Sequence, residues 1–456
     1  MNIKEIVKSQ KAYFETGKTL DYENRLESLQ KLKKILINHE DELADALQKD
    51  LNKSKEEVFM TEIGFTLTEL SYMEKRLKKF MKTKKVKTPL AQFHSSSFVV
   101  PEPYGNTLIM SPWNYPITLS FGPMIGAIAA GNTVILKPSN YSFNISMVMK
   151  KLINQFFDEN YIAVVTGGRE ENNELLDEKF DYIFFTGSPV VGRIVMEKAA
   201  KNLTPACLEL GGKSPCIIDK GTNVDLAAKR IAFGKSINSG QTCVAPDYLF
   251  VHEYDKHKFI DSYKKYIEEF YGENPLEYDK MVHIINQKHY DRLKSLFENE
   301  NIIFGGACDD QKLLIEPTLI DNIDGNSLIM QEEIFGPILP ILTYKDIDDV
   351  IKFVNSREKP LALYFFSENK NNEDKMLRQC SFGGGCINDT IIHIASDSMP
   401  FGGVGNSGMG TYHGKASFDI FTHYKSILKK YNWVDLPMRY LPYNEKKSKL
   451  IRFFLK

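Results

Sequence analysis

The chain has 456 residues, of which 43% are hydrophobic and 26% are charged, and its 58 Lys and Arg residues nearly balance 59 Asp and Glu residues. This composition is typical of a soluble globular protein, and the length is sufficient for two or three domains. A net charge of -1 gives no electrostatic basis for binding nucleic acid or an anionic membrane surface. The composition therefore favours chemistry on small molecules.

Two long helices are predicted at the start of the chain. From Leu26 to Leu47, apolar residues recur at the 3.6-residue spacing of an amphipathic helix. A second helical stretch is expected from Lys55 to Lys82, with a basic outer face that keeps the helix solvated.

Short apolar runs separated by helix-length segments follow the two helices. The runs are Asn106–Met110, Thr133–Leu136, Ile162–Thr166, Tyr182–Thr186 and Ala206–Leu210. Because parallel strands need crossover connections, this alternation predicts a doubly wound α/β sheet with helices on both faces. Ligands bind such sheets beyond the carboxyl ends of the strands, so the polar or glycine-bearing segment after each run is a candidate site loop.

A second α/β region is expected from residue 211 to about residue 410, with runs at Tyr248–Val251, Ile302–Phe304, Ile338–Leu342 and Leu363–Phe366. Two further strand-like patches, Phe98–Pro101 and a stretch near His423–Lys429, lie outside both sheets, and we assign them to an oligomerisation arm. Residues 446–456 mix basic and apolar side chains. We favour a solvated or dimer-packed tail there over one that lies on a membrane.

The cysteines and the N-terminus indicate the compartment. No C-x-x-C pair and no histidine cluster accompanies the six cysteines, so neither a metal site nor a disulfide framework is expected; they are Cys207, Cys216, Cys243, Cys308, Cys380 and Cys386. Residues 1–16 lack the apolar core of a signal peptide, and no stretch reaches the roughly 18 apolar residues of a membrane span. These features predict a reduced, cytoplasmic protein with no transmembrane segment.

Cys243 is the candidate nucleophile. A free cysteine is usually a small buried hydrophobe, but Gly240, Gln241 and Thr242 place this sulfur in a polar loop. Free backbone N–H groups in such a loop would favour the thiolate and could donate to an oxyanion.

Glu209 and Asn114 are candidates for the two other catalytic groups. Glu209 ends a buried strand, where burial would raise its pKa towards the range of a general base. Alternatively, the N–H groups of Gly211 and Gly212 satisfy its carboxylate. The carboxamide of Asn114 could donate to an oxyanion, although the residue also suits a plain turn before a proline.

Several residues at the predicted sheet edge could bind a cofactor. Lys137 ends a strand and could bind ribose hydroxyls or phosphate, or be solvated. Gly187 and Ser188 precede a helix expected near Val190, whose N-terminal N–H groups could bind a pyrophosphate. The spacing of Gly187 and Gly192 does not match G-x-G-x-x-G, so this segment alone does not define a dinucleotide site.

Taken together, these motifs resemble the aldehyde dehydrogenase superfamily, and specifically its class 3 branch. Seven motifs occur in the family's order and extend over nearly the whole chain: SPWNYP, VILKPS, FFTGS, CLELGGKSP, GQTCVAPDY, EEIFGP and PFGGVGNSGMG. GQTCVAPDY, the chain length and the Tyr412-His413-Gly414-Lys415 continuation are the class 3 features. The resemblance implies a Rossmann-like cofactor domain, an α/β catalytic domain and a small β oligomerisation arm.

The resemblance also implies the activity, which is NAD(P)-dependent oxidation of medium- to long-chain aliphatic or aromatic aldehydes to carboxylic acids. Cys243 would be the nucleophile, Glu209 the base that activates water, and Asn114 with the Cys243 N–H the oxyanion hole. Residues 1–82 and 106–210 would bind the dinucleotide, residues 211–410 would be catalytic, and residues 83–105 and 411–456 would form the arm and tail of a homodimer.

The cofactor, NAD or NADP, would be bound by residues from several motifs, namely Trp113, Lys137, Asn140, Gly187, Ser188, Glu333 and Phe335. Asn140 departs from the pattern, because many members have a glutamate there. A carboxylate at that position accepts from the adenosine ribose and repels a 2′-phosphate, so its loss removes a reason to reject NADP.

The aldehyde channel implied by the resemblance is mostly apolar and is lined by Tyr115, Phe233, Ile391, Ile394 and Phe401. Such a channel suits a hydrophobic aldehyde better than a semialdehyde, whose distal carboxylate would need a cationic partner.

Two alternative functions remain. A coenzyme A-acylating dehydrogenase would resolve the thioester with a thiol, although such enzymes generally lack the base at Glu209. A non-catalytic scaffold protein could also keep this fold.

Overall fold

The apolar runs predicted between residues 106 and 210 form a parallel sheet in the computed structural model, which describes residues 2–455. Its strands are β3 Asn106–Met110, β4 Thr133–Lys137, β5 Ile162–Val164, β6 Tyr182–Gly187 and β7 Ala206–Leu210. Their spatial order is β7-β6-β3-β4-β5. Nearly every residue of these strands is buried, which is why each one has a continuous apolar run rather than an alternating pattern.

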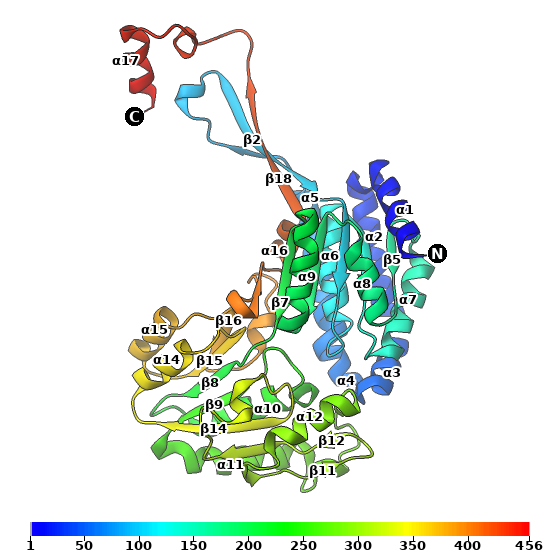
Figure 1. The fold of residues 1–456 in the computed structure, drawn as a ribbon, viewed down its shortest axis with the longest axis vertical. Coiled ribbons are helices and arrows are strands. Elements are labelled where there is room, and N and C mark those ends of the chain that lie inside the picture. The colour runs from blue at the N-terminus through cyan, green and yellow to red at the C-terminus, as the bar shows by residue number, and fades with distance from the viewer. Residues whose placement is uncertain (1, 456) are drawn as a thin grey trace.

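Helices cross between these strands and cover the sheet, which confirms the predicted doubly wound α/β fold (Figure 1). The crossover helices are α6 Thr118–Ala130, α7 Phe143–Phe156, α8 Arg169–Asp177 and α9 Pro189–Asn202. α6 is buried along almost its whole length because the N-terminal helices pack over it.

The prediction of two long N-terminal helices is right for the second and wrong for the first: the helical stretch from Lys55 is continuous to Phe80, whereas the stretch Leu26–Leu47 is divided between two helices. The segment contains α1 Ile3–Glu15, α2 Tyr22–Asn38, α3 Glu40–Leu51, α4 Lys55–Val58, a π-helical turn at Phe59–Ile63 and α5 Gly64–Phe80. A single non-helical residue, His39, separates α2 from α3. The periodicity hides this break because Leu36 and Leu43 stay seven residues apart and are both buried.

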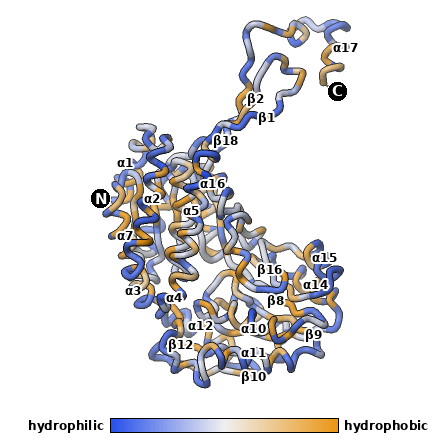
Figure 2. The backbone as a smooth tube through the Cα atoms, turned by 180° about the vertical axis from the view of Figure 1, so that it is seen from behind, coloured by the Kyte–Doolittle hydropathy of each residue, from blue (hydrophilic) through white to orange (hydrophobic). Residues whose placement is uncertain are grey.

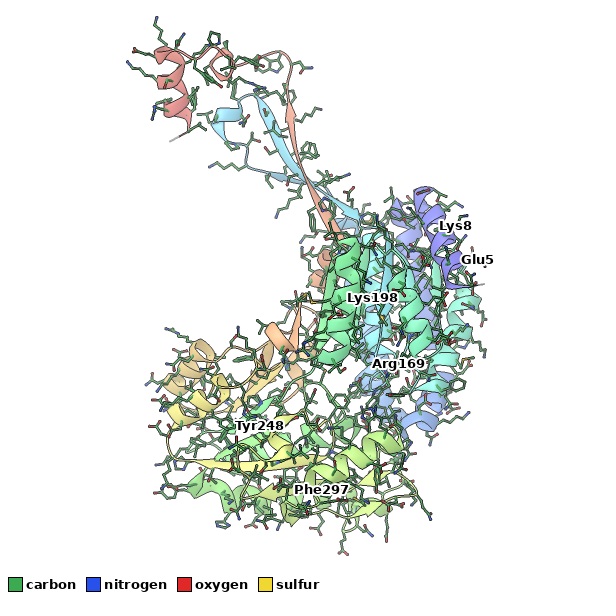
Figure 3. The ribbon with its side chains drawn as sticks, viewed as in Figure 1. Glu5, Lys8, Arg169, Lys198, Tyr248 and Phe297 are labelled. Atoms are coloured by element: carbon green, nitrogen blue, oxygen red, sulfur yellow. The ribbon has the colours of Figure 1, made fainter. Side chains whose placement is uncertain are left out.

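A second sheet forms the other lobe, in the order β10-β13-β14-β9-β8-β15-β16. All neighbours are parallel except β10 and β13. The predicted runs lie in β9 Tyr248–His252, β10 Asn301–Phe304, β14 Ile338–Tyr344 and β15 Ala362–Phe366. The sequence did not indicate β8 Pro215–Ile218, β13 Thr318–Asp321 or β16 Gly384–Ile387. Tyr248, labelled in Figure 3, is buried in this lobe.

The helices of this lobe are α10 Val224–Ser236, α11 Lys256–Tyr271, α12 Gln287–Phe297, α13 Leu328–Gln331, α14 Ile347–Asn355 and α15 Lys370–Gln379. A small hairpin joins β11 Cys308–Asp309 to β12 Leu314–Ile315. After β16 the chain returns to the first sheet, where β17 Gly408–Met409 pairs antiparallel with β7. This return places Gly408 opposite Glu209.

The two strand-like patches outside both sheets pair with each other in a long arm. β2 Ser95–Pro103 lies between β1 Lys84–Val86 and β18 Thr422–Lys430, and all pairings are antiparallel. α16 Lys415–Ile420 precedes the arm's last strand, and α17 Glu445–Phe454 follows it. The arm and α17 project from the body (Figure 1), and hydrophobic residues occur along both (Figure 2). Among the described residues, no helix is long and apolar enough to span a bilayer.

Candidate active site

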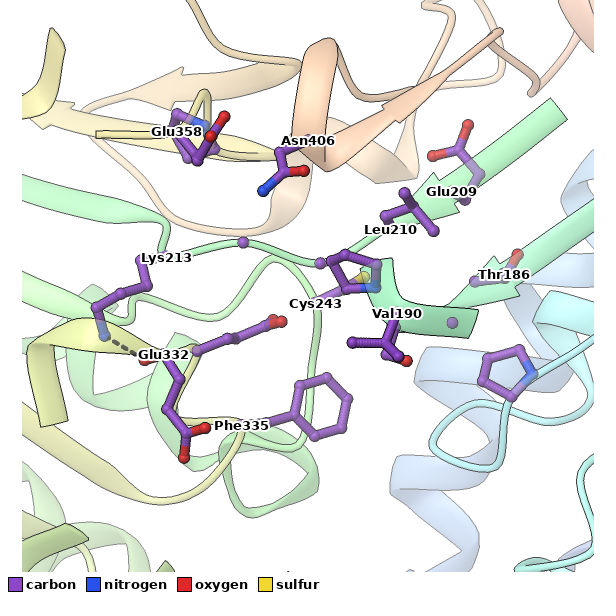
Figure 4. Close-up of a pocket in the computed structure, with 18 of the residues that line it drawn as sticks. Thr186, Val190, Glu209, Leu210, Lys213, Cys243, Glu332, Phe335, Glu358 and Asn406 are labelled. Atoms are coloured by element: carbon purple, nitrogen blue, oxygen red, sulfur yellow. Dashed lines mark hydrogen bonds between the residues drawn. The ribbon is translucent and has the colours of Figure 1, made fainter. Parts of the chain in front are cut away.

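A cleft of about 880 Å³ lies where the two lobes meet. Its walls include five residues predicted from sequence, which are Asn114, Glu209, Cys243, Glu333 and Phe335. Figure 4 shows Cys243, Glu209 and Phe335 around the same pocket, contributed by different segments of the chain. The structure therefore brings together residues that are more than 200 positions apart in sequence.

Cys243 follows a short turn, Ile237–Gly240, that ends α10. Three consecutive residues of this turn have left-handed backbone angles, with φ of 53° at Asn238, 49° at Ser239 and 68° at Gly240. A side chain at Gly240 would place its Cβ 2.3 Å from the Gly336 carbonyl oxygen, so the position requires glycine. The sulfur is thus carried by a tightly constrained loop.

Gln241 holds the same loop from inside the lobe. Its Nε2 donates to the carbonyls of Asn238 and His283 at 3.0 and 3.1 Å, and its Oε1 accepts from the Ile285 N–H at 3.1 Å. The side chain is fully buried. These three bonds fix the backbone immediately before the nucleophile.

Without bound substrate or cofactor, the environment of Cys243 favours the protonated thiol at neutral pH. Burial raises its pKa to about 12, and the neighbouring carboxyls of Glu333 and Glu209 add to the rise. The N–H groups of Cys243 and Val244 act in the opposite direction but do not overcome burial. The backbone donors of the loop favour the thiolate, as expected, but desolvation outweighs them, so the net shift favours the thiol.

Glu209 lies on β7 with only 2% of its surface exposed. Its Oε1 has a single contact, with the Cys207 sulfur at 3.8 Å, and its Oε2 has no hydrogen-bond partner among residues 2–455. Burial raises the pKa of this carboxyl well above the usual value. The alternative in which glycine N–H groups satisfy the carboxylate does not hold here, since no bond from Gly211 or Gly212 reaches Glu209 in the described structure.

Asn114 lies on the turn after β3 and is buried. Its Nδ2 donates one hydrogen bond to the Gln241 carbonyl at 3.0 Å, and a carboxamide nitrogen has a second hydrogen to give. The bond to Gln241 links the turn to the cysteine loop across the two lobes. Asn114 is therefore oriented by the same segment that carries Cys243.

The opposite wall has the features expected of a nicotinamide site. The rings of Trp113 and Phe335 meet edge to face at 5.5 Å. Burial raises the pKa of Glu333 to about 8, with the charge of Asp247 contributing. The Glu333 carboxyl packs so closely on Gly211 that a Cβ there would lie 2.0 Å from its Oε2.

Gly187 and Ser188 also line the cleft, and Ser188 is the N-cap of α9, which begins at Pro189, one residue before the predicted start near Val190. The N–H groups of that first turn point towards bound anions in other proteins. Thr186, on the same strand end, has a buried Oγ1 without a hydrogen-bond partner in the described chain. The described residues therefore fit a pyrophosphate-containing cofactor.

Lys137 and Asn140 are not among the residues that line this cleft. Lys137 ends β4, and its Nζ donates to the carbonyls of Gly167 and Pro138 at 2.8 and 3.0 Å. Burial lowers its pKa to about 8. Asn140 lines a smaller pocket of about 140 Å³ with Gly167 and Thr166. Both residues are at the carboxyl edge of the first sheet, where the predicted adenosine site belongs.

The predicted channel residues do not line the 880 Å³ cleft. Tyr115 forms a 2.6 Å hydrogen bond with the Thr242 hydroxyl, and Phe401 stacks on His413 at 5.5 Å. Ile391 is buried, Ile394 is half-buried, and Phe233 is at the surface of α10. Their role in an aldehyde channel therefore stays a prediction.

A second hollow of about 460 Å³ lies close to some of these residues. Phe59, Met60, Phe65 and Leu67 line it together with His413, whose ring is 5.4 Å from that of Phe65. The sequence analysis did not single out this apolar group. The sequence signal for this group is the set of apolar residues near the start of the Lys55–Lys82 segment, namely Phe59, Met60, Phe65 and Leu67.

Within residues 2–455, no three His, Cys, Asp or Glu side chains are arranged to hold a metal ion. All six cysteines are free in the structure.

Comparisons with known proteins agree on one family. Residues 1–427 match the model of the aldehyde dehydrogenase family. The 4,4'-diaponeurosporen-aldehyde dehydrogenase of Staphylococcus aureus is 50% identical over 97% of both chains. The dimeric NADP-preferring aldehyde dehydrogenase of Canis lupus familiaris is 43% identical over 96% of this chain and 98% of that one.

Solved structures give the same result. The substrate-bound state of Staphylococcus aureus AldH covers both chains fully, with a TM-score of 0.98 and 50% identity. Betaine aldehyde dehydrogenase from the same organism, in complex with NAD+, has a TM-score of 0.85 at 25% identity and covers 96% of this chain and 89% of that one.

Proposed function

Because the chain belongs to the aldehyde dehydrogenase family and is an NAD(P)-dependent enzyme that oxidises aldehydes to carboxylic acids, we propose how its residues divide that work. Cys243 is the nucleophile, Asn114 and the Cys243 N–H form the oxyanion hole, and Glu209 is the base for hydrolysis. The observation that carries this proposal is the single cleft that Cys243, Asn114 and Glu209 share with Glu333 and Phe335.

The first step forms a bond between the Cys243 sulfur and the carbonyl carbon of the aldehyde. The thiol loses its proton before or during this attack, since its pKa is about 12 in the protein alone. The free hydrogen of Asn114 Nδ2 and the Cys243 N–H stabilise the resulting oxyanion, and such donors are each worth about 3 kcal/mol in other enzymes.

The cofactor supplies one function in the second step, because its oxidised nicotinamide accepts the hydride that leaves the former carbonyl carbon. Trp113, Glu333 and Phe335, which line the cleft together with Cys243, would hold that ring. Lys137 and Asn140 would contact the adenosine ribose, and the first turn of α9 with Gly187 and Ser188 the pyrophosphate. The product of this step is a thioester on Cys243.

Glu209 acts in the third step. Its unpartnered Oε2 is free to accept a proton from water, which attacks the thioester and displaces the Cys243 sulfur as the acid leaves. The raised pKa makes the carboxylate a stronger base once it has lost its own proton. The net reaction converts aldehyde, NAD(P)+ and water into acid, NAD(P)H and a proton.

Two variants test these roles. Cys243→Ser should abolish NAD(P)H formation from aldehyde, whereas Glu209→Gln should keep a single burst of NAD(P)H and slow steady turnover. Mass spectrometry of Glu209→Gln with aldehyde and oxidised cofactor should find the acyl group on Cys243. Full turnover by Cys243→Ser, or no adduct on that sulfur, contradicts the mechanism.

The preferred substrate in this proposal is a hydrophobic aldehyde. The predicted channel residues are mostly apolar, and the neighbouring hollow adds the apolar side chains Phe59, Phe65 and Leu67. The Staphylococcus aureus relative is named for a 4,4'-diaponeurosporen-aldehyde. Hexanal to dodecanal and benzaldehyde should therefore exceed succinic semialdehyde in kcat/KM, and the reverse order contradicts the proposal.

The same panel, run with and without coenzyme A, addresses the acylating alternative. Glu209 supports hydrolysis, so coenzyme A should not be required for turnover. A scaffold protein would form no NAD(P)H from any aldehyde in the panel.

We propose that both NAD and NADP are accepted. Asn140 is exposed at the edge of its pocket and carries no charge to repel a 2′-phosphate. The dog relative is named NADP-preferring. Asn140→Glu should raise KM for NADP more than KM for NAD, and an equal rise for both contradicts this role.

We also propose a homodimer formed through the arm, as the sequence analysis predicts. β18 and β16 are each at the edge of a sheet, and such edges are usually covered in native proteins. The dog relative is named dimeric. In this arrangement residues 1–82 and 106–210 bind the cofactor, residues 211–410 form the catalytic domain, and residues 83–105 and 411–456 join the subunits. The cytoplasmic location stays a prediction.

A further inference from the structure

A buried ion pair lies next to the turn at residues 114–118, the oxyanion turn, which carries the proposed oxyanion donor Asn114. Lys53, between α3 and α4, contacts Glu62 of the π-helical turn, with 2.8 Å between Nζ and Oε1. Both side chains are completely buried. Neither residue belongs to the motifs of the sequence analysis, and neither lines the catalytic cleft.

The Lys53 ammonium is bound to the residue proposed to stabilise the oxyanion. Its Nζ donates to the backbone carbonyl of Asn114 at 2.8 Å and lies 4.1 Å from the centre of the Tyr115 ring. The cation therefore contacts two consecutive residues of the oxyanion turn, one through a charge-assisted hydrogen bond and the other through its aromatic face.

Glu62 holds the other end of the same turn. Its Oε2 accepts from the Ile117 N–H at 2.8 Å, and its backbone carbonyl accepts from the Thr118 hydroxyl at 3.1 Å. With Lys53 on Asn114 and Glu62 on Ile117, the ion pair clamps the turn from residue 114 to residue 118. The π-helical turn that supplies Glu62 is of a rare type that occurs frequently at functional sites.

A third side chain connects this clamp to the cysteine loop. Asn238 Nδ2 donates to the Asn114 carbonyl at 3.1 Å and to the Gln241 carbonyl at 2.9 Å. The Asn238 N–H in turn donates to Glu57 Oε1 at 2.8 Å. The N-terminal helices thus hold the positions of Asn114 and of the loop that carries Cys243 relative to each other.

Stability alone does not account for such a pair. Two charges lose their hydration on burial, and apolar residues of similar volume often give an equally or more stable protein. In contrast, apart from the contact between Lys53 and Glu62 itself, every polar contact described above has a fixed direction and involves the oxyanion turn or the cysteine loop. Orientation of the oxyanion hole is the property that these contacts supply.

We propose that Lys53, held by Glu62, is a positioning residue for the oxyanion hole of this enzyme. The inference rests on the roles proposed for Asn114 and Cys243 and assigns the pair no contact with substrate. Loss of the ammonium leaves the Asn114 carbonyl with Asn238 Nδ2 as its remaining donor, so the turn and its carboxamide are held less firmly as charge develops on the oxygen. A displacement of about 1 Å at such a donor costs about 100-fold in rate.

The test removes both charges, so that neither is left buried without its partner. In Lys53→Met/Glu62→Gln, the glutamine still accepts from Ile117. We expect kcat for hexanal to fall about 100-fold with little change in KM for NAD(P). The melting temperature should stay within a few degrees of that of the wild type. Lys53→Arg, which keeps a cationic donor, should retain more activity than the double variant.

Alkylation of Cys243 by iodoacetamide separates positioning from general damage to the site. The sulfur displaces iodide without forming an oxyanion, so its alkylation rate should match that of the wild type. If the double variant does not fold, Lys53→Met/Glu62→Leu, which fills the space with apolar groups, takes its place. Lys33→Met is the matched control, because Lys33 forms a 2.8 Å pair with Glu74 between α2 and α5, away from the turn.

A folded double variant whose kcat is within twofold of the wild type overturns the proposal. So does an alkylation rate that falls in parallel with kcat, which would indicate general disruption of the cysteine loop. Failure of the proposed function has a different signature, because the wild type itself would then be inactive or would keep its activity as Cys243→Ser.

Discussion

At the residue scale, burial determines the protonation of the catalytic groups. Cys243 and Glu209 both have a raised pKa, and desolvation is the largest cause for each. In both groups the shift favours the uncharged form, and both side chains line the same cleft.

The pKa of Cys243 leads to a prediction about alkylation. Only the thiolate reacts, and well below a pKa of about 12 its fraction rises about tenfold for each unit of pH. Without cofactor, the rate of Cys243 alkylation by iodoacetamide should therefore keep rising from pH 6 to pH 9.5. Peptide mapping measures this rate at each pH. A plateau below pH 8 would mean that the thiol ionises much more easily than its burial implies.

Glu69 gives a second prediction about pH, away from the proposed catalytic groups. This buried carboxyl accepts from the Gly414 N–H at 2.8 Å and from the Ser417 hydroxyl at 3.1 Å. Burial raises its pKa to about 7 from 4.5. The folded protein therefore binds this proton more tightly than the unfolded chain, and the resulting stability is lost as the pH rises from about 4.5 to 7.

Glu69→Gln removes this titration and keeps an oxygen that can accept from Gly414. The melting temperature of the variant, relative to that of the wild type, should rise between pH 5 and pH 7 and level off above pH 8. The corresponding change in unfolding free energy is at most about 3 kcal/mol. Thermal melts across pH 5 to 9 measure it. A difference that is constant across this range would show that Glu69 does not titrate there.

At the element scale, the loop before Cys243 depends on one glycine. Gly240 has a φ of 68°, and a Cβ there would approach the Gly336 carbonyl oxygen to 2.3 Å. Gly240→Ala must therefore displace the chain next to the nucleophile. We expect kcat to fall by at least about tenfold and the melting temperature to drop, since small displacements of a reacting atom are costly.

Gly272→Ala is the matched control for this prediction. Gly272 also has a positive φ, 83°, but a Cβ there would meet no atom within 4 Å. That variant should have only a backbone cost of about 1–3 kcal/mol, since a φ of 83° with a ψ of -174° is nearly restricted to glycine, and should keep its kcat. Equal effects of the two variants on kcat would mean that the close approach to Gly336 is unimportant.

The sequence predicts elements well where burial is continuous and poorly where contacts are made across the fold. β3, β4, β6 and β7 follow directly from their apolar runs, because both faces of a parallel sheet are covered. β16 has no such run, since two of its four residues are glycines. The break at His39 leaves the apolar period intact, so periodicity could not detect it.

The same distinction applies to the site. Cys243, Glu209 and Asn114 stand in recognisable motifs. Lys53 and Asn238 act through bonds to backbone carbonyls more than 60 residues away in the chain, which no local pattern encodes. The protonation of Cys243 is hard to predict for a related reason. Polar neighbours in sequence do not show how strongly the rest of the folded chain desolvates a sulfur.

At the scale of the whole molecule, the arm is the feature that a single chain does not explain. β18 is exposed along most of its length, and its apolar residues Ile427 and Leu428 are both accessible. Because successive strand residues point to opposite faces, apolar surface is exposed on both sides of this strand. Such surface on a projecting arm is typical of an interface between subunits.

Ile427→Glu/Leu428→Glu should therefore shift the protein from dimer to monomer. The charged side chains would lose hydration if they were buried against a partner, whereas they cost little on an arm exposed to water. Light scattering after size-exclusion chromatography measures the mass. Tyr254→Glu is the control, because Tyr254 is an exposed aromatic residue of the second lobe, outside the arm, and its replacement should leave the mass unchanged. A double variant that remains dimeric would show that the subunits associate through another surface.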